Sequence, residues 1–90
     1  MMNLVYVKFP NTAANYLFEV PVGTDLKEGQ VVYVQNKNQR TPTQVVCSTD
    51  SFLLPEKTAD IIIREIFGTF TKPLSKVVGL AVPTYTMVSL

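Results

Sequence analysis

The sequence predicts a mainly β fold, a small antiparallel β-barrel of about five strands with one short α-helix. Several short segments alternate apolar residues with a period of two, which is typical of strands. Prolines and glycines separate these segments, and one segment instead repeats its apolar residues with the helical period. Ninety residues, of which 47% are apolar and 17% charged, predict a single folded domain over residues 1–90.

The first two strands are expected at residues 4–9 and 16–20. Pro10 ends the first and Pro21 the second, because proline cannot donate to a strand ladder. A turn centred on Gly23 follows. In the first strand Val5, Val7 and Phe9 share one face, and in the second Tyr16, Phe18 and Val20 do.

The next two strands are expected at residues 30–35 and 43–49. The first has apolar residues on both faces, which is typical of a central strand or of a strand that is covered on both faces. Residues 35–42 form the longest polar run and read as the hairpin loop between them. In the return strand, Val45 and Cys47 are expected to point inward.

A short helix is expected at residues 59–67. Its apolar residues recur at helical spacing and form one stripe: Ala59, Ile62, Ile63, Ile66 and Phe67. Thr58 is the expected N-cap, and Gly68 the residue after the last turn. The stripe predicts packing on the barrel. Ile61 lies off it and is either exposed or in contact with a partner.

A last core strand is expected at residues 76–82, ended by Pro83. The tail at residues 84–90 alternates weakly. It either completes the protein's own sheet or pairs with a strand of another chain, since an open edge strand is a template for pairing.

Composition narrows the classes of function. The net charge of +1 gives no broad cationic field. One cysteine excludes an internal disulfide and suits a reducing, cytoplasmic setting. The first ten residues do not form a charged region followed by a long apolar run, so we expect no secretory signal. Apolar runs are too short for a membrane span.

Catalytic chemistry is not expected. The chain has no histidine, the commonest general base and a frequent metal ligand. Cys47 has no visible base beside it and reads as a buried structural thiol. The seven carboxylates are scattered singly, so no acid–base pair, metal site or cofactor site is indicated.

Candidate binding residues are Lys37 and Arg40 in the polar hairpin, which lies in a stretch without acidic residues between Glu28 and Asp50. Amides and cations on a barrel loop suit phosphate contacts, although a solvated loop would have the same composition. Tyr16 and Tyr33 are candidates for stacking on bases, or for ordinary sheet packing. No acid follows Glu65, and the cations there are Lys72 and Lys76.

The order of these pieces resembles the N-terminal DNA-binding domain of the primosomal replication-restart helicase. The matching stretches are residues 5–7, 16–21 with Gly23, 27–29, 32–34, 44–48 and 74–78. That domain carries an aromatic–aspartate pair whose carboxylate helps to recognise a 3′ end of DNA. Here Tyr16 matches the aromatic, but Leu17 follows it. The helix at 59–67 is extra, and no Walker-type loop of the motor is present.

The resemblance implies a small barrel that binds single-stranded DNA without catalysis. The alternative is a protein-interaction adaptor, of a mobile genetic element or a replication assembly, that uses the hairpin and the tail at 84–90. A DNA-binding protein would show affinity that falls steeply with salt, whereas an adaptor would bury an apolar patch.

Overall fold

The computed structural model describes residues 1–35, 40–67, 75–81 and 87–90. Seven strands and one helix are found there, which confirms the mainly β fold. Their bounds are β1 (Met2–Lys8), β2 (Asn15–Val20), β3 (Val31–Gln35), β4 (Thr43–Cys47), β5 (Phe52–Leu54), α1 (Glu56–Phe67), β6 (Lys76–Ala81) and β7 (Met87–Ser89). The five expected strands correspond to β1, β2, β3, β4 and β6, with ends that differ by at most two residues.

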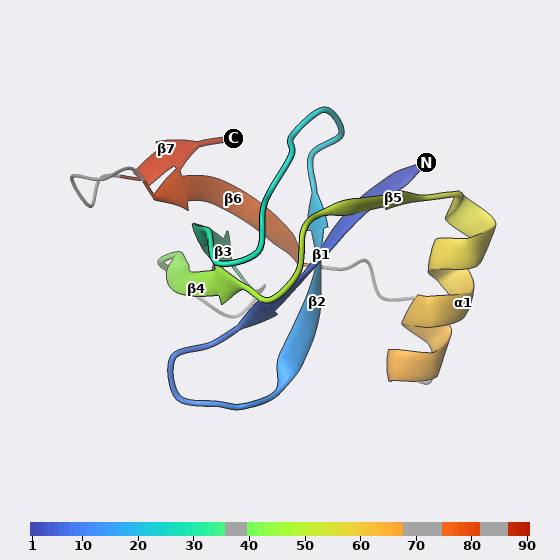
Figure 1. Cartoon of the computed structure of the whole chain (residues 1–90), viewed down its shortest axis with the longest axis horizontal. Helices are drawn as coiled ribbons and strands as arrows, with labels where there is room; N and C mark the ends of the chain where they lie inside the picture. Colours follow the sequence, from blue (N-terminus) through green and yellow to red (C-terminus); the bar gives the residue numbers. More distant parts are fainter. Residues whose placement is uncertain (36–39, 68–74, 82–86) are drawn as a thin grey trace.

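Five strands close into a barrel, as predicted (Figure 1). Their order is β2-β1-β4-β3-β6, and β6 pairs back onto β2. The ladders between neighbours are antiparallel, but the closing contact is parallel and pairs Glu19 with Lys76. There the backbone N–H of Glu19 donates to the carbonyl of Ser75 at 3.0 Å. The barrel therefore closes through one short parallel contact.

β5 is a strand that the sequence did not predict. β1 pairs with β2 along its length, while its other side pairs first with β5 and then with β4. β4 and β5 thus run along the same edge of β1, separated by residues 48–51. The N–H of Ser48 donates to the carbonyl of Tyr6 at 2.7 Å within this gap. Three residues, Phe52–Leu54, are too few for a period of two to show in the sequence.

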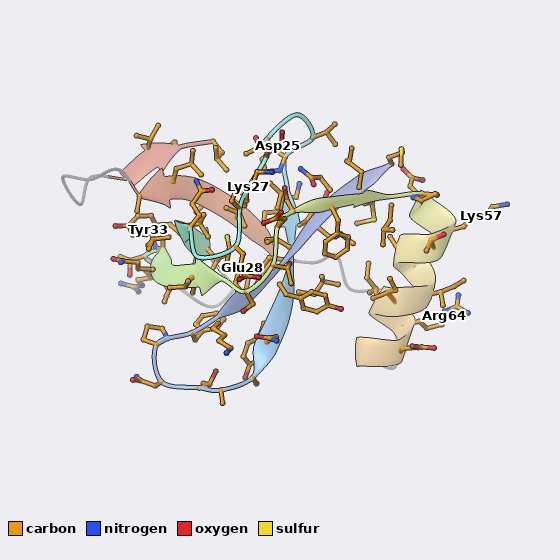
Figure 2. All side chains as sticks on the ribbon, viewed as in Figure 1. Asp25, Lys27, Glu28, Tyr33, Lys57 and Arg64 are labelled. Carbon is orange, nitrogen blue, oxygen red and sulfur yellow. The ribbon has the colours of Figure 1, made fainter. Side chains whose placement is uncertain are left out.

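The helix begins three residues before the predicted start. α1 spans Glu56–Phe67, and the N–H of Ala59 donates to the carbonyl of Pro55 at 3.0 Å. Thr58 lies inside the first turn, so its assignment as N-cap was wrong. The apolar stripe marks only the turns that contact the barrel, and the first turn is polar and exposed. Lys57 and Arg64 lie on exposed positions of α1 (Figure 2).

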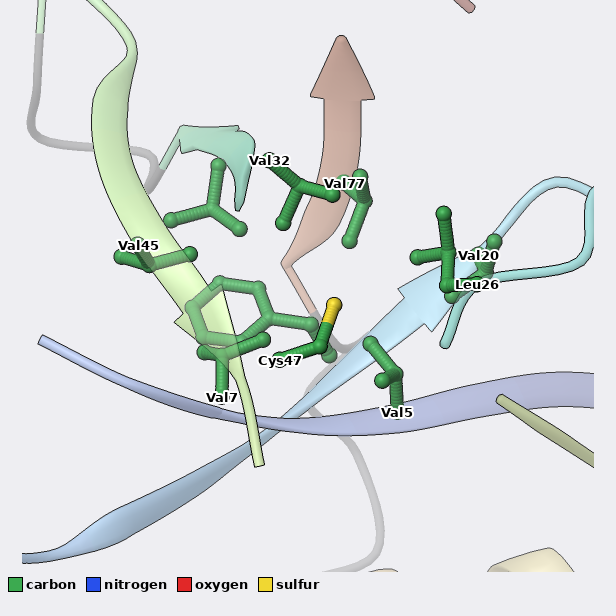
Figure 3. Close-up of a cluster of buried hydrophobic side chains, with 10 residues drawn as sticks. Val5, Val7, Val20, Leu26, Val32, Val45, Cys47 and Val77 are labelled. Atoms are coloured by element: carbon green, nitrogen blue, oxygen red, sulfur yellow. The ribbon is translucent and has the colours of Figure 1, made fainter. Parts of the chain in front are cut away.

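Apolar side chains from all five barrel strands fill the interior (Figure 3). This cluster contains Val5, Val7, Phe18, Val20, Leu26, Val32, Val34, Val45, Cys47 and Val77. The inward orientation predicted for Val45 and Cys47 is confirmed, and the Cys47 side chain is 1% exposed. Such burial removes apolar surface from water, the main favourable term in folding.

A second cluster lies between the barrel and α1. Its buried members are Leu4, Leu17, Ala59 and Ile63. Leu17 points away from the barrel interior, and the helix covers it. The packing of the helix on the barrel is therefore confirmed through Ala59 and Ile63, while the side chains of Ile66 and Phe67 lie outside those described. Ile61 is 62% exposed, as its position off the stripe allowed.

The C-terminal strand completes the protein's own sheet. β7 pairs antiparallel with β6, with Ser89 opposite Gly79 and Val88 opposite Leu80. The N–H of Leu90 also donates to the carbonyl of Val78 at 3.1 Å. Of the two expectations for the tail, this is the arrangement observed for residues 87–90. The expectations for Gly68, Pro83 and the tip of the polar hairpin fall outside the described residues.

Candidate nucleic-acid interface

Tyr33 lies on the outer wall of the barrel. Its neighbours Val32 and Val34 on β3 are buried in the interior, so Tyr33 points outward and is half-buried. The ladders place it directly across from Gln44 on β4 and from Gly79 on β6. Figure 2 shows Tyr33 on the side of the molecule away from α1.

Arg40 is exposed and lies just before β4, the strand whose Gln44 is directly across from Tyr33. Its backbone carbonyl accepts a hydrogen bond of 3.4 Å from Nε2 of Gln35. This bond ties the start of the return segment to the end of β3. Lys37, the second hairpin candidate, lies outside the described residues.

Tyr16 belongs to a different surface. It pairs with Val7, which points into the barrel, and directly opposed residues of an antiparallel pair share a face. Its ring meets Phe9 edge-on, with centroids 5.3 Å apart, at the end of the interior cluster. Tyr16 is 44% exposed because it lies at that open end. The structure therefore does not bring Tyr16 and Tyr33 onto one platform.

The outward residues of β4, β3 and β6 form one continuous surface, which we call the outer sheet face. It consists of Val31, Tyr33, Gln44, Val46, Gly79 and Ala81. Val31 and Val46 are directly opposed, and Val46 is exposed. The alternation along β3 and β4 could have identified the outward positions of those two strands, but not which strands lie next to each other. On β6, where Val77 points inward, Gly79 faces outward because the register with β3 shifts between Tyr33 and Val34.

Charge is distributed unequally over the fold. Residues 29–49 and 66–90 contain four basic residues and no acidic ones, a charge of +4. The rest of the chain contains four basic and seven acidic residues, a charge of −3. β3 and β4 come from the first acid-free segment and β6 and β7 from the second, and the order β4-β3-β6-β7 makes them neighbours. The fold thus joins two separate acid-free segments into one part of the sheet.

Cations border the outer sheet face. Lys8 at the end of β1 is exposed and lies opposite Val46, and Lys76 at the start of β6 is exposed. Arg40 lies at the β3–β4 end. Glu19 on β2 is the register neighbour of Lys76 and offsets part of its charge. The border of the outer sheet face is positive, but it contains few cations.

The described residues hold no cluster of three or more metal-ligating side chains. Burial raises the pKa of the Cys47 thiol from 9.0 to about 11, so the thiol stays protonated at neutral pH. In the described part of the chain, no helix is both long and apolar enough to cross a membrane.

No protein-family model, curated protein or solved structure matches this chain.

Proposed function

We propose that the protein is a non-catalytic module that binds single-stranded DNA on its outer sheet face. The observation that carries this proposal is the union of the two acid-free segments in neighbouring strands. A polyanion approaching this part of the sheet meets no carboxylate on β4, β3, β6 or β7. It would meet Arg40, Lys8 and Lys76 at the border.

The composition of the outer sheet face suits a single strand of DNA. An outward aromatic ring can stack on a base, and exposed cations can contact phosphates on either side. Few cations are available, so only about two or three phosphates can be neutralised. We therefore expect a weak affinity, with a Kd of about a micromolar or poorer at physiological salt.

The test is a titration of labelled single-stranded oligonucleotides at two salt concentrations. The double variant Lys37→Ala/Arg40→Ala should weaken binding and lower the salt dependence. The matched control is Lys57→Ala/Arg64→Ala, which removes the same charge from α1, away from Tyr33 (Figure 2). Equal losses in both double variants would show a nonspecific charge effect and would contradict the outer sheet face as the site.

A protein-interaction adaptor is the second candidate, and the edge of β7 favours it. The strand Met87–Ser89 carries no charge or proline, and Val88 is 46% exposed. The N–H of Leu90 points toward β6, so by alternation the N–H of Ser89 points away from it. Absence of DNA binding at low salt, together with a protein complex that Ser89→Pro abolishes and Ser89→Ala preserves, would support this candidate instead.

A further inference from the structure

We infer that Tyr33, Gly79 and Gln44 form a subsite for one unpaired nucleobase, and this inference rests on the proposed function. The three residues lie in one row across three neighbouring strands. Tyr33 is in the middle, with Gly79 on one side and Gln44 on the other. All three positions face outward.

The glycine gives the tyrosine ring room to lie against the sheet. Gly79 is buried although it faces outward and has no side chain of its own. Tyr33 on β3 and Ser89 on β7 lie directly across from it on that face, and Tyr33 has the larger side chain. Positive φ angles, which favour glycine, occur at Gly23 and Gly29 among the described glycines. Gly79 also lies where the register with β3 shifts, and its lack of a side chain leaves room for the ring beside it, as in the covering of strand glycines by cross-strand aromatics.

A tyrosine ring that lies along a sheet presents its free face outward. Such a face can stack on any base, because every base has a π surface, and each stack is worth about 1–3 kcal/mol. In a duplex this surface is already used by neighbouring bases. The subsite therefore takes a base from a single strand.

In the proposed subsite, Gln44 lies where it can hydrogen-bond to the edge of the same base. It is exposed, and its carboxamide offers both a donor and an acceptor beside the ring. Unpaired bases expose donors and acceptors on their Watson–Crick edges. Because the amide can rotate to exchange its donor and acceptor, we expect it to accept all four bases. The row Val31–Val46 next to it adds apolar surface without charge.

The charge of the surroundings matches this occupant. The strands that carry the row contain no acid, and Arg40 and Lys8 lie at its border, where the flanking phosphates of a bound strand would run. A polyanion with exposed bases can contact both the apolar centre, through its bases, and the positive border, through its phosphates. An acidic peptide would satisfy the border alone.

The experiment compares Kd values for a labelled 12-nucleotide single strand at low salt. Tyr33→Leu and Gly79→Val should each weaken binding about fivefold to a hundredfold, the range that one lost stack corresponds to. Gln44→Leu should weaken it about two- to tenfold. Tyr33→Phe, which keeps the ring, and Tyr16→Leu, which removes a tyrosine from another surface, should stay within about twofold of the wild type.

A duplex of the same sequence should bind at least about tenfold more weakly than the single strand. Thermal unfolding shows whether each variant is folded. If Gly79→Val does not fold, the comparison of Tyr33→Leu with the wild type decides the test. Salt-sensitive binding that Tyr33→Leu leaves unchanged would overturn the base subsite and keep the proposed function. Absence of binding by the wild type would overturn both.

Discussion

The side-chain amide of Asn3 donates a hydrogen bond of 2.7 Å to the backbone carbonyl of Thr24. It also donates to the carbonyl of Pro21 at 3.3 Å. Asn3 lies on β1, while both acceptors lie in the turn after β2. One buried amide therefore holds this turn against the barrel, next to the buried side chain of Leu26.

Asn3→Ala should lower the free energy of unfolding by about 1–3 kcal/mol, because the Thr24 carbonyl loses the Asn3 donor and the Pro21 carbonyl keeps only the N–H of Thr24. Denaturant unfolding measures the effect. Asn11→Ala is the matched control, since Asn11 is exposed in the loop after β1. Similar stabilities for the two variants would contradict a structural role for the Asn3 amide.

Ile63→Asp should lower the free energy of unfolding by several kcal/mol, because it places a charge between α1 and the barrel. Ile63 is 8% exposed there. Ile61→Asp makes the same chemical change two residues away at an exposed position, where about 0.5 kcal/mol or less is expected. The melting temperatures of the two variants show which face of the helix packs on the barrel. A larger loss of stability for Ile61→Asp than for Ile63→Asp would contradict the assignment of Ile63 to the packed face.

The Cys47 thiol should make stability depend on pH. Burial raises its pKa to about 11, so the unfolded chain loses the proton first as the pH rises. The contribution of the protonated thiol to the free energy of unfolding is complete below about pH 9. It is lost as the pH rises from about 9 to 11. The stability difference between wild type and Cys47→Ala should therefore change by about 1–2 kcal/mol from about pH 7.5 to about pH 10.5, in favour of the variant.

The same burial predicts slow labelling of Cys47 by a thiol reagent at about pH 8, with full labelling after denaturation. Rapid labelling of the native protein would place Cys47 on the outer face. A shift of one residue in the register of β4 would have this effect, because successive side chains of a strand point to opposite faces.

We predict no preference for a free 3′ end of DNA. Leu17 follows Tyr16 where the resembling helicase domain has a carboxylate, and Leu17 is buried under α1. It can neither reach a terminal hydroxyl nor accept a hydrogen bond from it. Oligonucleotides that end in a 3′ hydroxyl or a dideoxy nucleotide should bind with Kd values within about twofold of each other. A fivefold preference for the hydroxyl would contradict this expectation.

Local patterns predicted much of the fold because they report which side of an element is buried. The alternation in β3 placed Val32 and Val34 opposite Tyr33, and the stripe in α1 separated Ile63 from Ile61. The same patterns missed the first turn of α1, where no side chain packs on the barrel. They also missed β5, whose three residues are too few for a period.

The sequence by itself determined the barrel class, the residues that share a face in the first four strands, the inward side of the return strand and the presence of two acid-free segments. Only the tertiary structure decided that these segments supply neighbouring strands, and that Tyr16 ends the interior while Tyr33 lies on the outer wall. The physical reason is that periodicity is a local property of the chain. Strand order instead depends on hydrogen bonds between segments far apart in sequence, such as the ladder that sets Gly79 beside Tyr33.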